Sequence, residues 1–292
     1  MAYFDVPDME PQEFSLWQSL LDERTGLWLP ESRKIFLTAA LVRYIKDKKL
    51  SGYKALYSKL KKGDLTVLDW ASLVDTLTVH ETCYYREKNA IQFAVDYCKS
   101  KAIDGFKQQP DEPQHIQIWS VGCSTGEEVY TLAIEMDKLS YSLEESHGKK
   151  IYFGVTGVDI SYPSLNVASE GRYSSKQLDS LPDAVVRCYF DKLEDDVYQV
   201  SDNIKRRTCF IQGNVFDMGK KIKQKFDVIF CQNVLIYFRN ERKQQVVKQL
   251  KERLKPGGVL ILGHGEVTSI EADDLKKVDN KLCLAYEYVG KA

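Results

Sequence analysis

The chain has 292 residues, of which 43% are hydrophobic and 28% are charged, enough apolar sequence for one large domain or two unequal ones. These fractions exclude disordered and fibrous proteins. The 41 lysines and arginines balance the 42 acidic residues, so no overall field attracts nucleic acid or a membrane surface. Any electrostatic partner must therefore bind at a local site.

The N-terminal segment is acidic and has no apolar core, so we expect no signal peptide. There is no run of about 18 apolar residues that would span a bilayer. The seven cysteines are scattered without a Cys-x-x-Cys pair, which predicts reduced thiols in a cytoplasmic protein. The four histidines are not paired at metal-ligand spacing, so we expect no metal, and nothing in the sequence requires more than a monomer.

From Pro11 to about residue 98 the sequence has the apolar periodicity of amphipathic helices. The predicted buried stripes are Phe14, Trp17, Leu20 and Leu21 in the first helix and Ile35, Ala39, Val42 and Ile45 in the second. We therefore predict an all-α domain over residues 1–90, followed by a connecting helix and linker over residues 91–114.

A basic segment lies within this helical part, because residues 31–62 contain ten lysines and arginines and only two acids. One interpretation is a solvated helix face, where charged side chains are usually found. The other is a docking surface for an acidic partner. The sequence leaves both interpretations open.

After the linker, short β-rich runs alternate with helical ones. The predicted strands cover residues 116–121, 151–159, 208–211, 226–231 and 259–262, and the helix after the first strand has a buried stripe of Val129, Leu132, Ala133 and Met136. This alternation predicts an α/β fold with a doubly wound, mostly parallel sheet over residues 115–292. Ligands of such sheets bind at the carboxyl ends of the strands.

The first predicted strand ends in a loop bounded by Gly122 and Gly126, and a helix begins directly after it. The glycines let the backbone approach a ligand closely, and the start of the helix offers unpaired N–H groups. Because Glu127 and Glu128 follow, the loop would repel a phosphate, and neither Gly-x-Gly-x-x-Gly nor Gly-Lys-Ser/Thr is present. The loop favours a phosphate-free, positively charged ligand, unless the glutamates only complement the helix dipole.

Polar residues also follow the other strands. Asp159 ends the second strand, where an acid can bind both ribose hydroxyls of a nucleoside. Asn214 and Asn233 follow the third and fourth strands, and their amides can bind an adenine edge or a carboxylate, although a single Asn there is usually a turn residue. Together these side chains predict a pocket for a cationic adenosine derivative, of which S-adenosylmethionine is the obvious candidate.

Two longer motifs are Asp75-Thr-Leu-Thr-Val-His-Glu-Thr-Cys-Tyr-Tyr-Arg86 and Trp119-Ser-Val-Gly-Cys-Ser-Thr-Gly-Glu-Glu128. Together with Asn233-Val-Leu-Ile-Tyr-Phe238 and Leu254-Lys-Pro-Gly-Gly258, they resemble the CheR family of chemotaxis protein-glutamate methyltransferases over about residues 12–288. The resemblance implies a class I, Rossmann-like methyltransferase with a seven-stranded sheet. It also implies a small antiparallel β-subdomain inserted at about residues 187–211.

The resemblance further implies methyl transfer from S-adenosyl-L-methionine to glutamates of methyl-accepting chemotaxis receptors, with S-adenosyl-L-homocysteine as product and no metal. The expected catalytic residues are Tyr237, near the transferred methyl group, and Arg86, facing the incoming carboxylate. The expected cofactor-binding residues are His80, Thr82, Arg86, Gly122, Glu127, Asp159, Asn214, Val215, Gln232 and Asn233. Among them, Glu127 would hold the amino end of the cofactor and Asp159 its ribose.

The implied partner is the cytoplasmic helical part of a receptor, bound through the basic N-terminal helices, so that the protein meets the membrane only through receptors and binds no nucleic acid. The chain departs from the family pattern around Arg43 and Lys46, where it carries fewer basic residues. The segment 189–197 is also short and acidic, where relatives that bind a C-terminal receptor pentapeptide have a longer, Gly-containing loop. We therefore expect receptor recognition that is independent of the pentapeptide.

A glutamate side chain has a pKa of about 4.3, so the implied nucleophile is ionised at neutral pH and needs no general base. Two alternatives stay open: a methyltransferase of a small molecule or nucleic acid, and a cofactor-binding regulatory module that has lost catalysis. A nucleic-acid enzyme is expected to show a broad basic surface with stacking aromatic residues. The presence of Arg86, Asp159 and Tyr237 argues against an inactive module.

Overall fold

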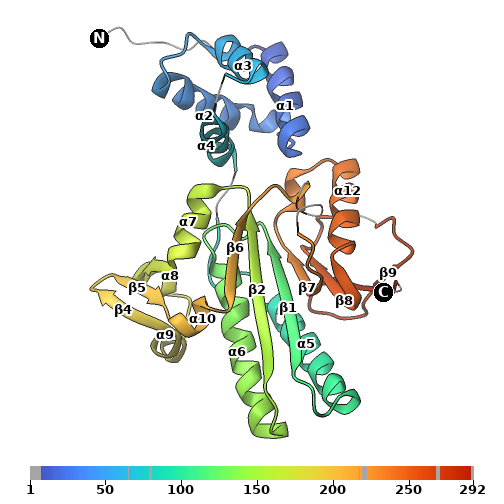
Figure 1. Cartoon of the computed structure of the whole chain (residues 1–292). Helices are drawn as coiled ribbons and strands as arrows, with labels where there is room; N and C mark the ends of the chain where they lie inside the picture. The colour runs from blue at the N-terminus through green and yellow to red at the C-terminus, as the bar shows by residue number, and fades with distance from the viewer. Residues whose placement is uncertain are drawn as a thin grey trace.

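The structure, a computed structural model, describes residues 8–64, 66–78, 81–216, 218, 222–267 and 270–290. A group of N-terminal helices lies at one end of a central sheet, and a second, small sheet lies at its side (Figure 1). The helical region consists of α1 (Pro11–Thr25), the 3-10 turn η1 (Glu31–Arg33), α2 (Lys34–Asp47), α3 (Tyr53–Lys62) and α4 (Val67–Leu77).

The boundaries of α1 follow from its end residues. Pro11 occupies the first helical position, where its missing N–H costs nothing, and Gly26 ends the helix with a left-handed φ of 77°. The predicted buried stripe of α1 is confirmed, because Phe14, Trp17, Leu20 and Leu21 all belong to the core of the helical region.

The predicted stripe of α2 is confirmed only in its second half. Ile45 is buried and Val42 packs against the core, but Ile35 is 84% exposed, and Leu37, Leu41 and Tyr44 are the other buried residues of the helix. The core of the helical region, formed with α1 and α3, selects this face. Periodicity alone could not separate two apolar stripes that lie next to each other on one helix.

The central sheet has the strand order β6-β2-β1-β7-β8-β10-β9. The five strands from β6 to β8 are parallel neighbours, whereas β10 runs antiparallel to both β8 and β9. The strands are β1 (Gln114–Val121), β2 (Ile151–Asp159), β6 (Thr208–Gln212), β7 (Phe226–Cys231), β8 (Leu254–Leu262), β9 (Leu275–Lys277) and β10 (Leu284–Tyr288). This confirms the predicted doubly wound, mostly parallel, seven-stranded sheet.

Two layers of helices cover the sheet. Alternate side chains of β7 point to opposite faces: Val228 and Phe230 belong to the core that includes α5 and α6, and Ile229 and Cys231 belong to the core that includes α12. The helices of the sheet domain are α5 (Lys88–Gln108), α6 (Glu127–His147), α7 (Tyr162–Glu170) and α12 (Asn240–Lys251). The predicted stripe of α6 is fully buried.

The second sheet is antiparallel, as predicted, with the order β3-β5-β4. Its strands are β3 (Arg172–Ser174), β4 (Phe190–Glu194) and β5 (Val197–Val200), with the short helices α8 (Ser175–Leu178), α9 (Asp183–Tyr189) and α10 (Asp202–Lys205) around them. It therefore extends beyond the expected range of about 187–211, because β3 pairs with β5.

The strand order creates a crevice beside β1. From β1 the chain continues to β2 and β6 on one side, and it then returns to β7 and β8 on the other side. The connections after β1 and β7 therefore start from neighbouring strands and lead to opposite sides of the sheet, and open α/β sheets bind ligands at such a point. The helical region lies over this end of the sheet (Figure 1).

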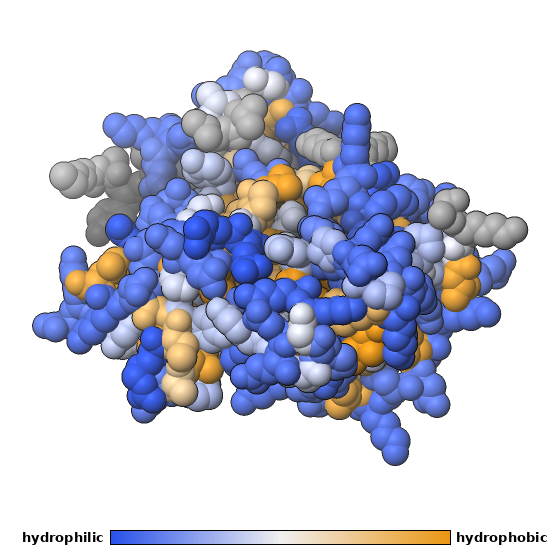
Figure 2. Space-filling model, turned by 60° about the horizontal axis from the view of Figure 1, so that its bottom comes forward, coloured by the Kyte–Doolittle hydropathy of each residue, from blue (hydrophilic) through white to orange (hydrophobic). Residues whose placement is uncertain are grey.

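The face turned forward in Figure 2 is mostly hydrophilic, with hydrophobic side chains in small, separate groups. In the part of the chain that the structure describes, no helix is both long and apolar enough to cross a membrane.

Asp227 on β7 joins three neighbouring elements from a buried position, with its side chain 1% exposed. Its carboxylate accepts from the Gln117 N–H at 2.8 Å and contacts Lys255 Nζ at 2.7 Å and Lys101 Nζ at 3.0 Å. We expect Asp227→Ala to lower the free energy of unfolding by about 1–3 kcal/mol, because the buried N–H loses its acceptor. Thermal unfolding measures this loss of stability. The control is Asp195→Ala, which removes an exposed carboxylate. Equal melting temperatures of the two variants would contradict the prediction.

Candidate active site

A cavity of about 350 Å³ opens at the carboxyl ends of β1, β2, β6 and β7, and the helical region forms part of its wall. This volume is in the usual range for small-molecule sites, about 300–1,000 Å³. The predicted residues that line it are Thr82, Arg86, Gly122, Asp159, Asn214, Val215, Gln232, Asn233 and Tyr237. The structure thus brings together side chains that the sequence separates widely. His80 lies outside the described residues.

The loop after β1 forms the floor of the cavity. Gly122 has a φ of 71°, and both Gly122 and Cys123 donate their N–H groups to the Val158 carbonyl. A Cβ atom added at Gly122 would lie 2.5 Å from Val234 Cγ2, so only glycine lets the loops after β1 and β7 meet here.

Asp159 is held rigidly at the end of β2. Its carboxylate accepts from the Ser124 N–H at 2.7 Å and from the Ser161 N–H at 2.8 Å, and the residue is buried except toward the cavity that it lines. The two amides hold both oxygens, so the carboxylate has a defined position at the cavity.

The two glutamates at the start of α6 have different surroundings. Glu127 does not line the cavity: its carboxylate accepts from Thr125 Oγ1 at 2.6 Å and from Gln177 Nε2 at 3.4 Å. Glu128 lines the cavity, and its carboxylate accepts from Ser120 Oγ at 2.7 Å. Burial raises the pKa of Glu128 to about 8. The geometry therefore gives Glu128, and not Glu127, the position to meet a cationic ligand.

The loop after β7 contributes two amide side chains. Gln232 is buried, and its Nε2 has no hydrogen-bond partner among the described residues. Buried polar groups are normally paired, so this donor is suited to an acceptor on a bound ligand. Asn233 has a left-handed φ of 59° and donates from Nδ2 to Glu87 Oε1 at 3.0 Å.

Asn214 joins the sheet to the helical region. Its Nδ2 donates to the Thr25 carbonyl at 3.1 Å, and its Oδ1 accepts from the Phe216 N–H at 3.1 Å. Val215 beside it is buried and forms apolar wall. The Asn214 side chain therefore positions the end of α1 at the cavity.

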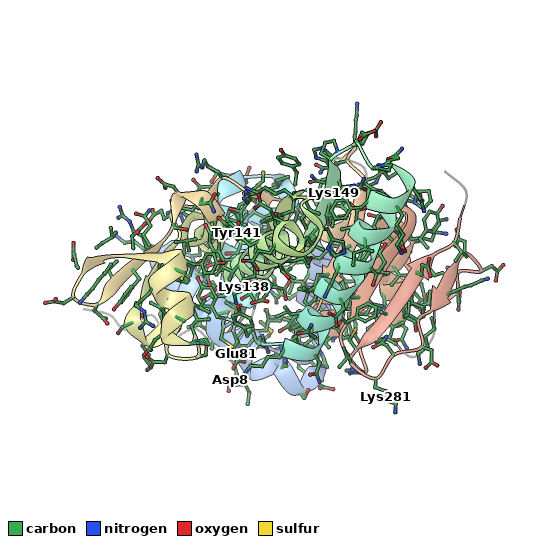
Figure 3. The ribbon with its side chains drawn as sticks, turned by 90° about the horizontal axis from the view of Figure 1, so that it is seen from below. Asp8, Glu81, Lys138, Tyr141, Lys149 and Lys281 are labelled. Atoms are coloured by element: carbon green, nitrogen blue, oxygen red, sulfur yellow. The ribbon has the colours of Figure 1, made fainter. Side chains whose placement is uncertain are left out.

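The segment 81–87, which contains two of the predicted site residues, is fixed to α6 through Tyr85. The Tyr85 N–H donates to Thr131 Oγ1 at 3.3 Å, and its hydroxyl donates to Glu135. Lys138 Nζ contacts the same carboxylate at 2.6 Å. Figure 3, which looks along α6 from below, shows Lys138 beside this helix.

The positive charges of two guanidinium groups, Arg33 and Arg86, affect the pKa of Tyr237. Arg86 donates to the Glu81 carbonyl and lines the cavity, and Arg33 lies with its guanidinium carbon 5.8 Å from the centroid of the Tyr237 ring. Burial raises the pKa of the Tyr237 hydroxyl above its ordinary value, although the positive charges of Arg33 and Arg86 oppose this. The hydroxyl therefore remains a neutral hydrogen-bond donor at physiological pH.

Arg33 and Trp28 are cavity residues that sequence reasoning missed. The backbone N–H of Trp28 donates to the Tyr237 carbonyl at 2.8 Å. The sequence marked Arg33 only as one member of the basic segment, and it gave no signal for Trp28. Both residues reach the cavity because the helical region packs on the sheet, which periodicity within one helix does not show.

A profile of the family described as CheR methyltransferase, SAM binding domain, matches residues 80–283, which is more than half of the chain. This protein belongs to that family. The resemblance of the four sequence motifs is thereby confirmed. A cavity with the carboxyl group of Glu128 near the start of α6 is consistent with a SAM-dependent methyltransferase, because its cofactor is positively charged.

Three relatives illustrate the likeness of this chain to chemotaxis methyltransferases. The chemotaxis protein methyltransferase of Borreliella burgdorferi is 29% identical over 243 residues, which cover 82% of this chain and 83% of that protein. Chemotaxis protein methyltransferase 2 of Vibrio cholerae is 28% identical over 261 residues, with coverage of 88% and 86%. Chemotaxis protein methyltransferase Cher2 of Pseudomonas putida is 25% identical over 281 residues, with coverage of 94% and 97%.

The close contact at Gly122 gives a first test of the site. We expect Gly122→Ala to weaken binding of S-adenosylhomocysteine at least about tenfold, because the new methyl group displaces Val234 and strains a left-handed backbone position. Isothermal titration calorimetry measures this. The matched control is Gly148→Ala, which has a similar φ of 67° but no atom within 4 Å of the added Cβ. Equal affinities of the two variants would show that the contact is unimportant.

The raised pKa of Glu128 gives a second test. The carboxyl is largely protonated below its pKa of about 8, and an ammonium group on the ligand favours the ionised form. We therefore expect the affinity for S-adenosylhomocysteine to rise from pH 6 to pH 8, by at most about tenfold per pH unit, and then to level off. Titrations should show this slope in the wild type and lose it in Glu128→Gln. The same slope in both would assign the titration to the ligand or to another residue.

Proposed function

We propose that this protein transfers a methyl group from S-adenosylmethionine to the side-chain carboxylate of glutamate residues in methyl-accepting chemotaxis receptors. The products are a glutamate methyl ester and S-adenosylhomocysteine. The observation that carries the proposal is the pair of guanidinium groups, Arg33 and Arg86, that lie near Tyr237 at a cavity that also contains the carboxyl group of Glu128, which a cationic ligand would ionise. This arrangement suits a cationic cofactor and an anionic methyl acceptor in one site.

In this proposal the chain's own residues hold the cofactor by complementary chemistry. Glu128 would pair with its ammonium group, Asp159 would accept from the ribose hydroxyls, and Gln232 would donate through its unpaired Nε2. Thr82, Asn214, Val215 and Asn233 would border the remaining parts. When bound, the cofactor supplies an electrophilic methyl group on a sulfonium.

In this reaction the main task of the protein is to position the two reactants. A lone pair of the receptor carboxylate forms the new O–C bond while the C–S bond breaks, and the electron pair of that bond stays on sulfur. The carboxylate is already ionised at neutral pH, so no proton has to move. Arg33 and Arg86 would orient the carboxylate, and Tyr237 would border the space in which it meets the methyl group. Well-oriented groups can supply about 7–11 kcal/mol of the barrier reduction.

The helical region is the proposed receptor-binding part of the chain. Arg33, which precedes α2, lines the cavity, and α2 and α3 carry most of the basic segment 31–62. The basic segment thus begins at the mouth of the site. This favours docking of an acidic receptor helix over the alternative of an unrelated solvated face.

The experiment that tests the function is the transfer of a labelled methyl group from S-adenosylmethionine to receptor-containing membranes, with alkaline release of methanol as the readout. Base-labile label on a receptor band is the expected result. Absence of label, in a preparation that binds S-adenosylhomocysteine, would refute receptors as the methyl acceptor and favour a different substrate or an inactive regulatory module.

In the same assay we expect Arg86→Ala and Arg33→Ala each to lower kcat/KM by about 10- to 100-fold, because each removes a charged donor to the acceptor carboxylate. Affinity for S-adenosylhomocysteine should change little in Arg33→Ala. Arg187→Ala removes an exposed arginine of α9 and is the control. Near-wild-type turnover of either cavity variant would exclude a role for that residue in orienting the carboxylate.

The β4–β5 hairpin supports recognition that does not depend on a receptor tail. It turns through only Asp195 and Asp196, and β4 is exposed over most of its length. A receptor ends in a free carboxylate, and these acids disfavour it. We expect no binding of a C-terminal receptor pentapeptide in a fluorescence-anisotropy titration, and unchanged methylation of a receptor that lacks its tail. Saturable binding at micromolar peptide would disprove this.

A further inference from the structure

Glu266, which follows β8, is a buried carboxylate that joins two strand ends. It is only 2% exposed, and both of its oxygens accept from the backbone. Oε1 accepts from the Leu235 N–H at 3.0 Å, and Oε2 accepts from the Gly263 N–H at 2.8 Å. One side chain thus ties the loop after β7 to the end of β8.

The backbone of Glu266 is also hydrogen-bonded through both of its polar groups. Its N–H donates to the Gly263 carbonyl at 3.2 Å, and its own carbonyl accepts from Lys243 Nζ at 2.7 Å. Gly263 is a glycine for a steric reason, because an added Cβ would lie 2.5 Å from Glu266 Oε2. The carboxylate therefore fills the space beside Gly263.

The loop that receives this support carries the cavity side chains Gln232, Asn233, Val234, Ile236 and Tyr237. Leu235 begins the 3-10 turn η2 (Leu235–Tyr237), whose last residue is Tyr237. Burial raises the pKa of Glu266, and the backbone N–H groups of Val234, Leu235 and Ile236 oppose this by favouring the ionised carboxylate. These amides converge because the turn is wound at this point.

Glu266 does not line the cavity. Its influence has to pass through the loop. Val234, which precedes the bonded Leu235, is the residue that contacts Gly122 in the loop after β1. The Glu266 carboxylate is thus bonded to the residue next to the one that meets the floor of the cavity.

We infer that Glu266 is a positioning residue for methyl transfer, which holds the 232–237 loop, and Tyr237 with it, against the floor of the cofactor cavity. The role of Tyr237 rests on the proposed function, whereas the hold on the loop does not. Two experiments separate these parts.

The first experiment needs no methyl acceptor. Glu266→Gln keeps the size of the side chain but replaces one acceptor oxygen with an NH2 group, so either Leu235 or Gly263 faces a donor in place of an acceptor. We expect amide hydrogen exchange of the 233–238 segment to become at least about tenfold faster, with exchange in α6 unchanged. The control is Glu271→Gln, at an exposed position. Unchanged exchange in 233–238, or equal acceleration throughout the sheet, would overturn the inference.

The second experiment is a double-mutant cycle on turnover with Glu266→Gln, Tyr237→Phe and the double variant. We expect Glu266→Gln to lower kcat about tenfold, with receptor KM and the Kd of S-adenosylhomocysteine within about threefold of wild type. The double variant should be no slower than Tyr237→Phe, because both changes act on one side chain. Multiplicative losses would show that Glu266 does not act through Tyr237. If wild type methylates no receptor, the proposed function fails, and the exchange measurement still decides whether Glu266 holds the loop.

Discussion

The contact between Gly122 and Val234 is the constraint on which the site depends. Because the chain reverses its strand order beside β1, the loops after β1 and β7 start from neighbouring strands, and they meet where an added Cβ would lie 2.5 Å from Val234. The first loop then presents its Ser124 N–H to Asp159, and the second turns into the 3-10 turn that ends at Tyr237. The close approach of Gly122 to the Val234 side chain thus lies between the loop that holds Asp159 and the loop that ends at Tyr237.

The cavity keeps opposite charges on different elements. Glu128 is held by Ser120 within the sheet domain, whereas Arg33 comes from the helical region and Arg86 from the segment that connects the two. A cationic cofactor and an anionic acceptor attract each other, and in free solution they would meet in any orientation. In the proposed reaction, fixed charged groups on separate elements would select one orientation without reorganising.

Much of this site could be predicted because strand ends converge whatever the details of packing. Asp159, Asn214 and Asn233 were each expected at the end of a predicted strand, and the structure does bring them to one cavity. The choice between Glu127 and Glu128 could not be made in this way, since consecutive helix residues point about 100° apart and only the packing around Thr125 and Gln177 decides which one turns inward.

The prediction of the buried face of α2 failed at Ile35 for a related reason. Ile35 belongs to an apolar stripe in the sequence, but the neighbouring helices pack on Leu37 and Leu41. Contacts between the helical region and the sheet, such as the hydrogen bond from Trp28 to Tyr237, have a further consequence. Part of the cavity wall comes from residues 25–33, so the helical region and the cavity are not separable modules. A chimaera that exchanged the helical region between two relatives would also exchange a piece of the cavity wall, and it could work only where that piece fits the new sheet domain.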